Sequence, residues 1–161
     1  MTEEDRIERL VCEYGRMLVR LAASRLDSVA DAEDAVQDVF CTLVSKKLVF
    51  VDPEYEKAWL IRATINRASD LRRRKSRLNV PLDEARAVPD DAAETERRGR
   101  EMLACVRALP EKYAVVLHLH YYEGCGLREI GVMLRVPAAT VGARLARGRA
   151  RLKALLEEES L

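Results

Sequence analysis

The chain has 161 residues, 48% of them hydrophobic, so it carries too many apolar side chains for the intrinsically disordered class. Its 28 Lys and Arg nearly balance its 27 Asp and Glu, and the formal net charge of +1 means that any binding of a polyanion must rely on a local basic patch. Only seven Gly and five Pro interrupt the chain, and no stretch alternates like a β-strand for long. These features predict an all-α protein.

Two amphipathic helices are predicted in the first 45 residues. The first spans 5–26, with apolar residues at helical spacing from Ile7 to Leu26. The second has Asp31 as its N-cap and an apolar stripe from Ala32 to Val44. Its other face carries Glu33, Asp34, Gln37 and Asp38. This acidic face either reflects the favourable placement of acids at the start of a helix or docks a basic partner, and spacing alone does not rank docking first.

A basic and aromatic segment is predicted from 46 to 77. A short loop with Lys46, Lys47 and Phe50 leads to Asp52 and Pro53, which favour the start of a long helix over about 53–77. Side chains that can stack on unpaired bases or bind their phosphates follow on this helix: Tyr55, Lys57, Trp59, Arg62, Asn66 and Arg67. From 66 to 77, six Lys or Arg stand against one acid, although a solvated helix end is the simpler explanation of that run alone.

The segment 78–98 separates two predicted helical domains, 1–77 and 99–161. It contains two prolines, and between 83 and 96 six acids stand against one Arg, so we expect a flexible acidic linker. Beyond it, helices are predicted over about 95–108 and 111–122, and Gly126 is placed to cap the next helix. Each domain is near the lower size limit for a core that is stable by itself.

The stretch 126–152 predicts two helices joined by a tight turn. Leu127, Ile130 and Leu134 share one face of the first helix, and Pro137 is expected to be the first residue of the second. Small residues open the second helix, as insertion into a DNA major groove requires: Ala138, Ala139, Thr140, Gly142 and Ala143. From 126 to 153 seven Lys or Arg stand against one acid, which favours DNA binding over a merely solvated helix.

Metal, cofactor and enzyme chemistry find little support in the sequence. The four cysteines are far apart, and the only two histidines, His118 and His120, face different ways on one predicted helix. No nucleophile or carboxylate pair has a useful spacing. We therefore expect free thiols, no metal site, no cofactor and no enzymatic activity.

The ends of the chain show no sign of targeting. The opening MTEEDRIERL is acidic, unlike a signal peptide, and no apolar run approaches the roughly 20 residues of a membrane helix. We expect a cytoplasmic protein.

These segments together resemble a known family. DAEDAVQDVF at 31–40, KAWLIRATINRASDLRRRK at 57–75, LPEKYAVVLHLHYYEG at 109–124, LREIGVML at 127–134 and TVGARLARGRARL at 140–152 are similar, in this order, to motifs of bacterial RNA polymerase sigma factors. The chain resembles the extracytoplasmic-function (ECF) group of the sigma-70 family. The resemblance implies that 1–77 is sigma region 2, that 78–98 is the linker and that 99–161 is sigma region 4, with its helix-turn-helix.

The resemblance also implies partners and site residues. Core RNA polymerase would be bound through the β′ clamp helices by Asp34, Gln37, Asp38 and Phe40, and through the β flap by the C-terminal domain. The −10 promoter element would be melted and read by Lys46, Lys47, Phe50, Tyr55, Lys57, Trp59, Arg62, Asn66, Arg67 and Arg73. The −35 duplex would be read by Arg128, Pro137, Ala138, Ala139, Thr140, Gly142, Ala143, Arg144, Arg147, Arg149 and Arg151. An anti-sigma factor that covers these surfaces is a further expected partner.

The chain departs from the family pattern in the helix-turn-helix. It has Gly131 where the family usually has Ala, Arg135 where the turn usually has Gly, and Gly142 at a position that is often basic. We expect Arg135 to adopt a positive φ at some energetic cost, and Gly142 to weaken both the helix and its grip on phosphate.

Two other classes of function compete with this interpretation. A stand-alone helix-turn-helix repressor or activator would need only the C-terminal half and would bind duplex DNA tightly without polymerase. It leaves the basic and aromatic helix at 57–75 unexplained. An enzyme has no candidate catalytic residues.

Overall fold

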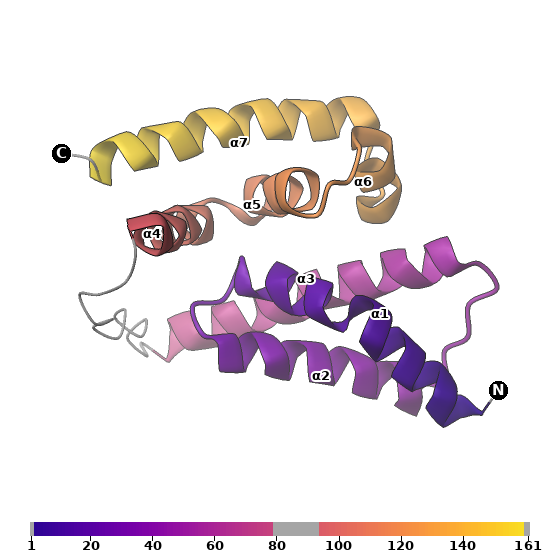
Figure 1. Cartoon of the computed structure of the whole chain (residues 1–161). Coiled ribbons are helices and arrows are strands. Elements are labelled where there is room, and N and C mark those ends of the chain that lie inside the picture. Colours follow the sequence, from indigo (N-terminus) through magenta and orange to yellow (C-terminus); the bar gives the residue numbers. More distant parts are fainter. Residues whose placement is uncertain (1, 79–93, 160–161) are drawn as a thin grey trace.

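The helices form two layers, one from each half of the chain (Figure 1). The structure is a computed structural model that describes residues 2–78 and 94–159. Within those ranges all regular secondary structure is helical, as predicted. None of the helices in the described ranges is long and apolar enough to cross a membrane.

The N-terminal layer contains α1 (Glu3–Ala23), α2 (Val29–Ser45) and α3 (Pro53–Arg77). Thr2 caps α1 in a capping box with Asp5. The Asp52 carboxylate accepts from the amide of Glu54 at 2.9 Å, so the predicted start of α3 is confirmed. The predicted N-cap of α2 is wrong, because Ser28 holds that position and its hydroxyl accepts from the amide of Asp31.

The C-terminal layer contains α4 (Glu94–Ala108), α5 (Glu111–Leu117), a π-helical turn η1 (His118–Tyr122), α6 (Leu127–Leu134) and α7 (Ala138–Glu159). Helix α4 begins at Glu94, close to the start predicted at about 95, so residues 94–98 at the end of the predicted linker are helical, and residues 79–93 of the linker lie outside the described part of the chain. Helix α7 begins one residue later than predicted. Pro137 precedes it, and its carbonyl accepts from Thr140 and Val141.

The buried apolar side chains of both layers belong to one connected cluster. Leu18 and Leu21 of α1 and Leu43 of α2 are at most 1% exposed, and so are Ile61 of α3 and Ile130 of α6. The two layers thus pack against each other, with α6 placed on α3 (Figure 1).

The turn between α6 and α7 relies on two unusual residues. Arg135 has φ 60° and ψ 43°, which confirms the expected left-handed conformation. The carbonyl of Gly131 accepts from the amide of Val136 at 2.9 Å. A Cβ added to Gly131 would lie only 2.7 Å from the carbonyl oxygen of Val136. Glycine at 131 therefore lets the chain turn back tightly over the end of α6.

This geometry predicts opposite effects for two substitutions in the turn. Gly131→Ala should lower the free energy of unfolding by about 1–3 kcal/mol, because the clashing atom is a main-chain oxygen that cannot move aside freely. Arg135→Gly should raise it by up to about 1 kcal/mol, because glycine adopts the left-handed conformation without steric cost. Urea unfolding, with the m-value checked for constancy, measures both.

Gly99→Ala is the matched control for the alanine substitution. A Cβ at Gly99, within α4, would meet nothing within 4 Å, so alanine there should raise stability by up to about 1 kcal/mol through helix propensity. A Gly131→Ala chain as stable as the parent would contradict the close approach described above.

Candidate nucleic-acid interface

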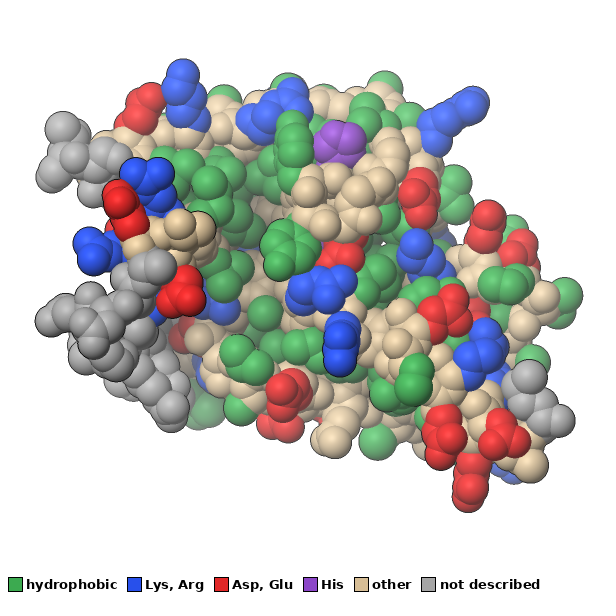
Figure 2. All heavy atoms as spheres, viewed as in Figure 1, with side chains coloured by type: hydrophobic (Ala, Val, Ile, Leu, Met, Phe, Trp, Pro, Cys, Tyr) green, Lys and Arg blue, Asp and Glu red, His purple; other side chains and the backbone are tan. Residues whose placement is uncertain are grey.

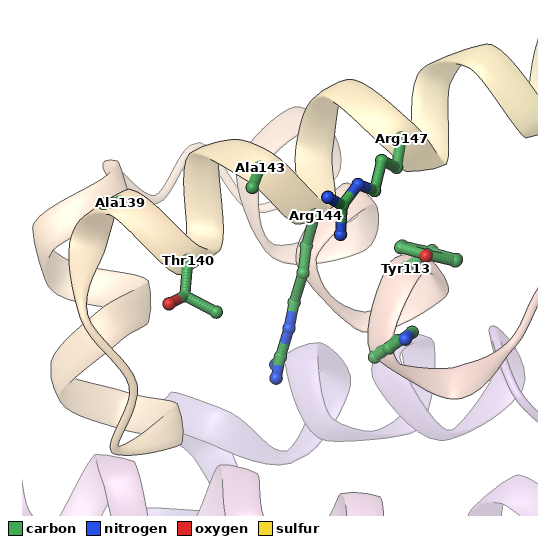
Figure 3. Close-up of a pocket in the computed structure, with 7 residues that line it drawn as sticks. Tyr113, Ala139, Thr140, Ala143, Arg144 and Arg147 are labelled. Atoms are coloured by element: carbon green, nitrogen blue, oxygen red, sulfur yellow. The ribbon is translucent and has the colours of Figure 1, made fainter.

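One side of α7 carries the polar side chains predicted to read duplex DNA. Thr140, Arg144 and Arg147 lie on the same side of the helix, and Tyr113 of α5 lies on that side too (Figure 3). With Lys112, Ala139 and Ala143 they line a shallow hollow. Val141 and Leu145, on the other side of α7, are at most 2% exposed. The burial of these apolar residues turns the cationic side outward.

Further cations extend this surface along α7 and onto α5. The guanidinium of Arg151 lies 4.9 Å from the ring centroid of Tyr113, and the ammonium of Lys112 lies 5.1 Å from the same centroid. Arg149 donates to the hydroxyl of Tyr121. Sequence reasoning missed Lys112, because only the packing of α5 against α7 brings it beside the cationic side of α7.

The turn before α7 adds a second hollow. Its lining includes Arg128, Arg135, Pro137 and Ala138, three of which were predicted to contact DNA. Gly142 lies differently, because a Cβ there would come within 3.3 Å of a methyl group of Leu127. Position 142 therefore faces α6, and the structure does not place it with the exposed side chains of α7.

The loop before α3 and the start of α3 form an aromatic and basic surface. The rings of Phe50 and Trp59 lie 5.8 Å apart at 41°, and both are half-buried. Tyr55 is 67% exposed, and Lys46 and Lys47, which follow the end of α2, are exposed too. This part of the chain therefore carries both partly accessible aromatic rings and exposed cations.

The other α3 residues predicted to contact the −10 element differ in what surrounds them: two are exposed, one contacts α2 and two contact α6. Asn66 and Arg73 are exposed, and Arg73 pairs with Asp70 on the same helix. Arg67 donates from Nε to Asp38 of α2 at 2.8 Å. Lys57 and Arg62 instead contact α6 of the other layer, and the structure does not leave them free.

The acidic face of α2 is largely accessible. Asp34 and Gln37 are exposed, and Asp38 is half-buried through its ion pair with Arg67. Phe40 was predicted to belong to this docking face, but its side chain is only 9% exposed and lies in the core. Periodicity placed Phe40 on the apolar stripe of α2, and the structure agrees with that stripe.

A charged cluster joins the layers near η1. Arg20 of α1 donates to both carboxylate oxygens of Glu123, at 2.9 and 3.0 Å. Glu123 also lies 3.2 Å from Nε2 of His118, whose pKa is lowered by burial and raised in part by that carboxylate. Figure 2 shows Lys or Arg side chains beside Asp or Glu side chains between the two layers. Spacing along the chain could not predict this pair, because Arg20 and Glu123 are far apart in the sequence.

We also searched the described residues for a group of side chains that could bind a metal ion. Across residues 2–78 and 94–159, no three His, Cys, Asp or Glu side chains come together in a way that could hold a metal ion. Burial raises the pKa of the Cys125 thiol, which makes it a poorer metal ligand and nucleophile.

Comparison with known proteins matches both layers to parts of one family. The family models described as Sigma-70 region 2 and Sigma-70, region 4 match residues 10–78 and 99–152. The ECF RNA polymerase sigma factor SigM of Mycobacterium tuberculosis is 32% identical over 150 residues, which cover 92% of this chain and 76% of SigM. The ECF RNA polymerase sigma factor SigE of Mycolicibacterium smegmatis is 30% identical over 95% of this chain, which spans only 62% of SigE.

Two solved structures are similar to the whole arrangement. The sigma factor RpoE, solved in complex with the anti-sigma factor NepR from Bartonella quintana, matches with a TM-score of 0.71 at 20% identity, over 93% of this chain and 96% of RpoE. CnrH, solved in complex with the cytosolic domain of CnrY, matches with a TM-score of 0.69 at 26% identity, over 97% of this chain and 90% of CnrH. With both regions present in order and a relative such as SigM matched over most of its length, the chain belongs to the ECF group of the sigma-70 family of RNA polymerase sigma factors.

Proposed function

We propose that this chain binds core RNA polymerase and directs it to a subset of promoters, where it reads the −35 duplex and melts and reads the −10 element. The observation that supports this most is the presence of two different nucleic-acid surfaces in one chain. The side of α7 with Thr140, Arg144 and Arg147 suits a duplex, and the Phe50–Trp59 surface suits unpaired bases. A factor that only binds duplex DNA has no use for the second.

The −35 duplex would meet the start of α7. Exposed small residues, Ala139 and Ala143, would allow the helix to enter the major groove, and Thr140 and Arg144 beside them would contact base edges. Arg147, Arg149 and Arg151 follow along the helix and would bind phosphates, which give affinity without sequence preference. Lys112 would add a phosphate contact from α5.

The −10 element would meet the surface around Phe50 and Trp59. Taking a base out of the duplex costs a few kcal/mol. Stacking on an aromatic side chain returns about 1–3 kcal/mol per base, and cations such as Lys46 and Lys47 can hold the strand's phosphates. The surface would thus favour the melted state by binding alone. This mechanism needs no covalent chemistry, no enzymatic activity and no cofactor.

Polymerase would be docked by the acidic face of α2. Asp34, Gln37 and Asp38 offer carboxylate and amide oxygens to the β′ clamp helices, while the C-terminal unit would bind the β flap. Phe40 would support this face from the core.

We also propose that residues 1–77 and 99–161 act as separate units on a linker, that the chain works in the cytoplasm, and that an anti-sigma factor regulates it. RpoE and CnrH, which it resembles, were each solved with a second protein.

Transcription in vitro tests the function directly. The purified chain with core polymerase, but neither alone, should start transcription at a subset of promoters, and sequencing those transcripts would define the promoters. The exchange of Asp34 and Asp38 for Asn should weaken core binding, because two of the three carboxylate charges of the α2 face are lost. A chain that does not bind core at all, but binds duplex DNA tightly alone, would instead be a stand-alone regulator.

Arg147→Ala tests the phosphate contacts of α7. It should weaken −35 duplex binding evenly across sequences and lower the slope of log affinity against log salt by about one unit, as expected for one lost phosphate contact. Fluorescence anisotropy at several salt concentrations measures both effects. Arg16→Ala, which removes an exposed arginine of α1, is the control and should change neither. A sequence-selective loss would mean that Arg147 reads bases.

Trp59→Ala tests the aromatic surface. Core binding should persist, while promoter opening, measured by permanganate reactivity of unpaired thymines, should fall because about 1–3 kcal/mol of stacking is lost. Trp59→Phe keeps an aromatic ring and should restore most of the opening. Normal opening in the alanine variant would assign Trp59 to core packing alone.

A further inference from the structure

The loop between α2 and α3 is fixed at Leu48 by hydrogen bonds from two sides. Helix α2 ends in a Schellman motif, in which Lys47 has a φ of 51° and the amide of Leu48 donates to the carbonyl of Leu43 at 3.1 Å. The carbonyl of Leu48 accepts from Nη2 of Arg6 in α1 at 2.7 Å. Both main-chain polar groups of Leu48 are therefore held, one by α2 and the other by α1.

Arg6 is itself held by a buried carboxylate of α3. Nη2 of Arg6 lies 3.6 Å from Oε2 of Glu56, and Nη1 of Arg6 donates to Glu3 at 3.1 Å. The side chains of Arg6 and Glu56 are only 13% and 6% exposed. A buried carboxylate is stable only beside a partner of opposite charge, so Glu56 fixes where the guanidinium of Arg6 lies. We call Arg6 and Glu56 the loop brace.

Residues 49–51 span the gap between Leu48 and Asp52, which is the N-cap of α3. Their side chains alternate in direction. Val49 and Val51 are exposed, whereas Phe50 between them is half-buried and lies against Trp59. The loop therefore presents apolar side chains to a ligand while its main chain is fixed at both ends.

We propose that Arg6, oriented by Glu56, is a positioning residue for the −10 strand, because it holds 49–51 in the conformation that receives an unpaired base. The inference rests on the proposed function, since its ligand is the −10 strand. Both side chains of the loop brace are largely buried, so they act through the loop and not by touching DNA.

The effect of the loop brace on affinity comes from preorganisation. A loop that is ordered before binding has little conformational freedom left to lose when the strand arrives. Fixing the backbone of a single residue opposes binding by a factor of about 5 to 30. Without the loop brace, the strand would have to order the loop itself, and its affinity should fall by about that factor.

Fluorescence of Trp59 tests whether the loop brace orders the loop. Trp59 is the only tryptophan of the chain, and its ring centroid lies 5.8 Å from that of Phe50, so its emission reports on the loop. Arg6→Met keeps a long side chain but removes the donors, and it should increase the quenching of Trp59 by acrylamide. Equal quenching in the Arg6→Met and unchanged chains would overturn the proposal.

Two further variants separate the loop from general stability. Arg9→Met is the matched control, because Arg9 of α1 pairs with Glu56 at 3.7 Å and with Glu13 at 3.5 Å, and neither partner belongs to the loop. It should leave the quenching unchanged. Arg6→Met with Glu56→Gln removes both charges of the loop brace and should increase quenching even if the single variant folds poorly. Circular dichroism confirms that each compared variant is folded.

Binding of single-stranded DNA tests the consequence. The probe is the non-template −10 strand of a promoter found by transcript sequencing, and it is offered to the chain in complex with core polymerase. Arg6→Met should lower the affinity by about 5- to 30-fold, and Arg9→Met should leave it unchanged. Affinity of the −35 duplex should be the same for both variants and the unchanged chain. An Arg6→Met chain that binds the −10 strand with unchanged affinity would overturn the proposal.

Removal of single bases from the probe separates positioning from mere stability. Each nucleotide in turn is made abasic, and binding by the unchanged chain should weaken at the positions whose bases it holds. The Arg6→Met chain should lose this sensitivity at the position held by the loop and keep it elsewhere, as coupled groups do. Equal sensitivity of both chains at every position would overturn the proposal.

Failure of the proposed function gives a different result. A chain that starts no transcription with core polymerase would refute that function and, with it, the −10 role of Arg6. The quenching of Trp59 would still show whether the loop brace orders the loop.

Discussion

The structure depends on how its two long basic helices, α3 and α7, are divided into a buried and a charged side. Helix α7 buries Val141 and Leu145, and α3 buries Ile61 and Ala68, while their arginines remain at or near the surface. Burial of apolar side chains is the main favourable term in folding, whereas an unpaired charge is costly to bury. A chain with a net charge of only +1 can therefore present two strongly basic surfaces. The compensating acids lie elsewhere, on α2 among other places.

The seam between the layers connects stability with the proposed activity. It is held by Arg20 with Glu123, by Lys57 with Glu129, and by arginines on main-chain carbonyls. The two layers also share one connected apolar cluster. Ion pairs in contact with water contribute little to the stability of such an interface, and salt screens them. An interface of this kind can hold two small helical units together in the free chain and still separate when each unit has its own partner.

The helix-turn-helix shows how a departure from a family pattern is accommodated. Arg135 occupies a left-handed position that the family usually gives to glycine, and Gly131 sits where the main chain of Val136 approaches most closely. The turn therefore combines an unfavourable φ at Arg135 with the absence of a side chain at Gly131. Gly142, the third departure, faces Leu127 of α6. The absence of a basic residue at 142 therefore affects the contact between α6 and α7 and has little effect on the exposed side of α7.

Four features could be predicted from the sequence alone: the all-α class, the extent of α3, the apolar stripes and the order of the family motifs. These follow from spacing along one helix and from local capping, as at Asp52 and Pro53. Which of the predicted residues lie together depends on how the helices pack in three dimensions. That packing places Gly142 against α6, and Lys57 and Arg62 under α6. It also brings Lys112 of α5 beside α7, and it joins the ends of α1 and α4 through Arg25, Arg72 and Arg107. Periodicity specifies which side of a helix is buried, but not which distant helix covers it.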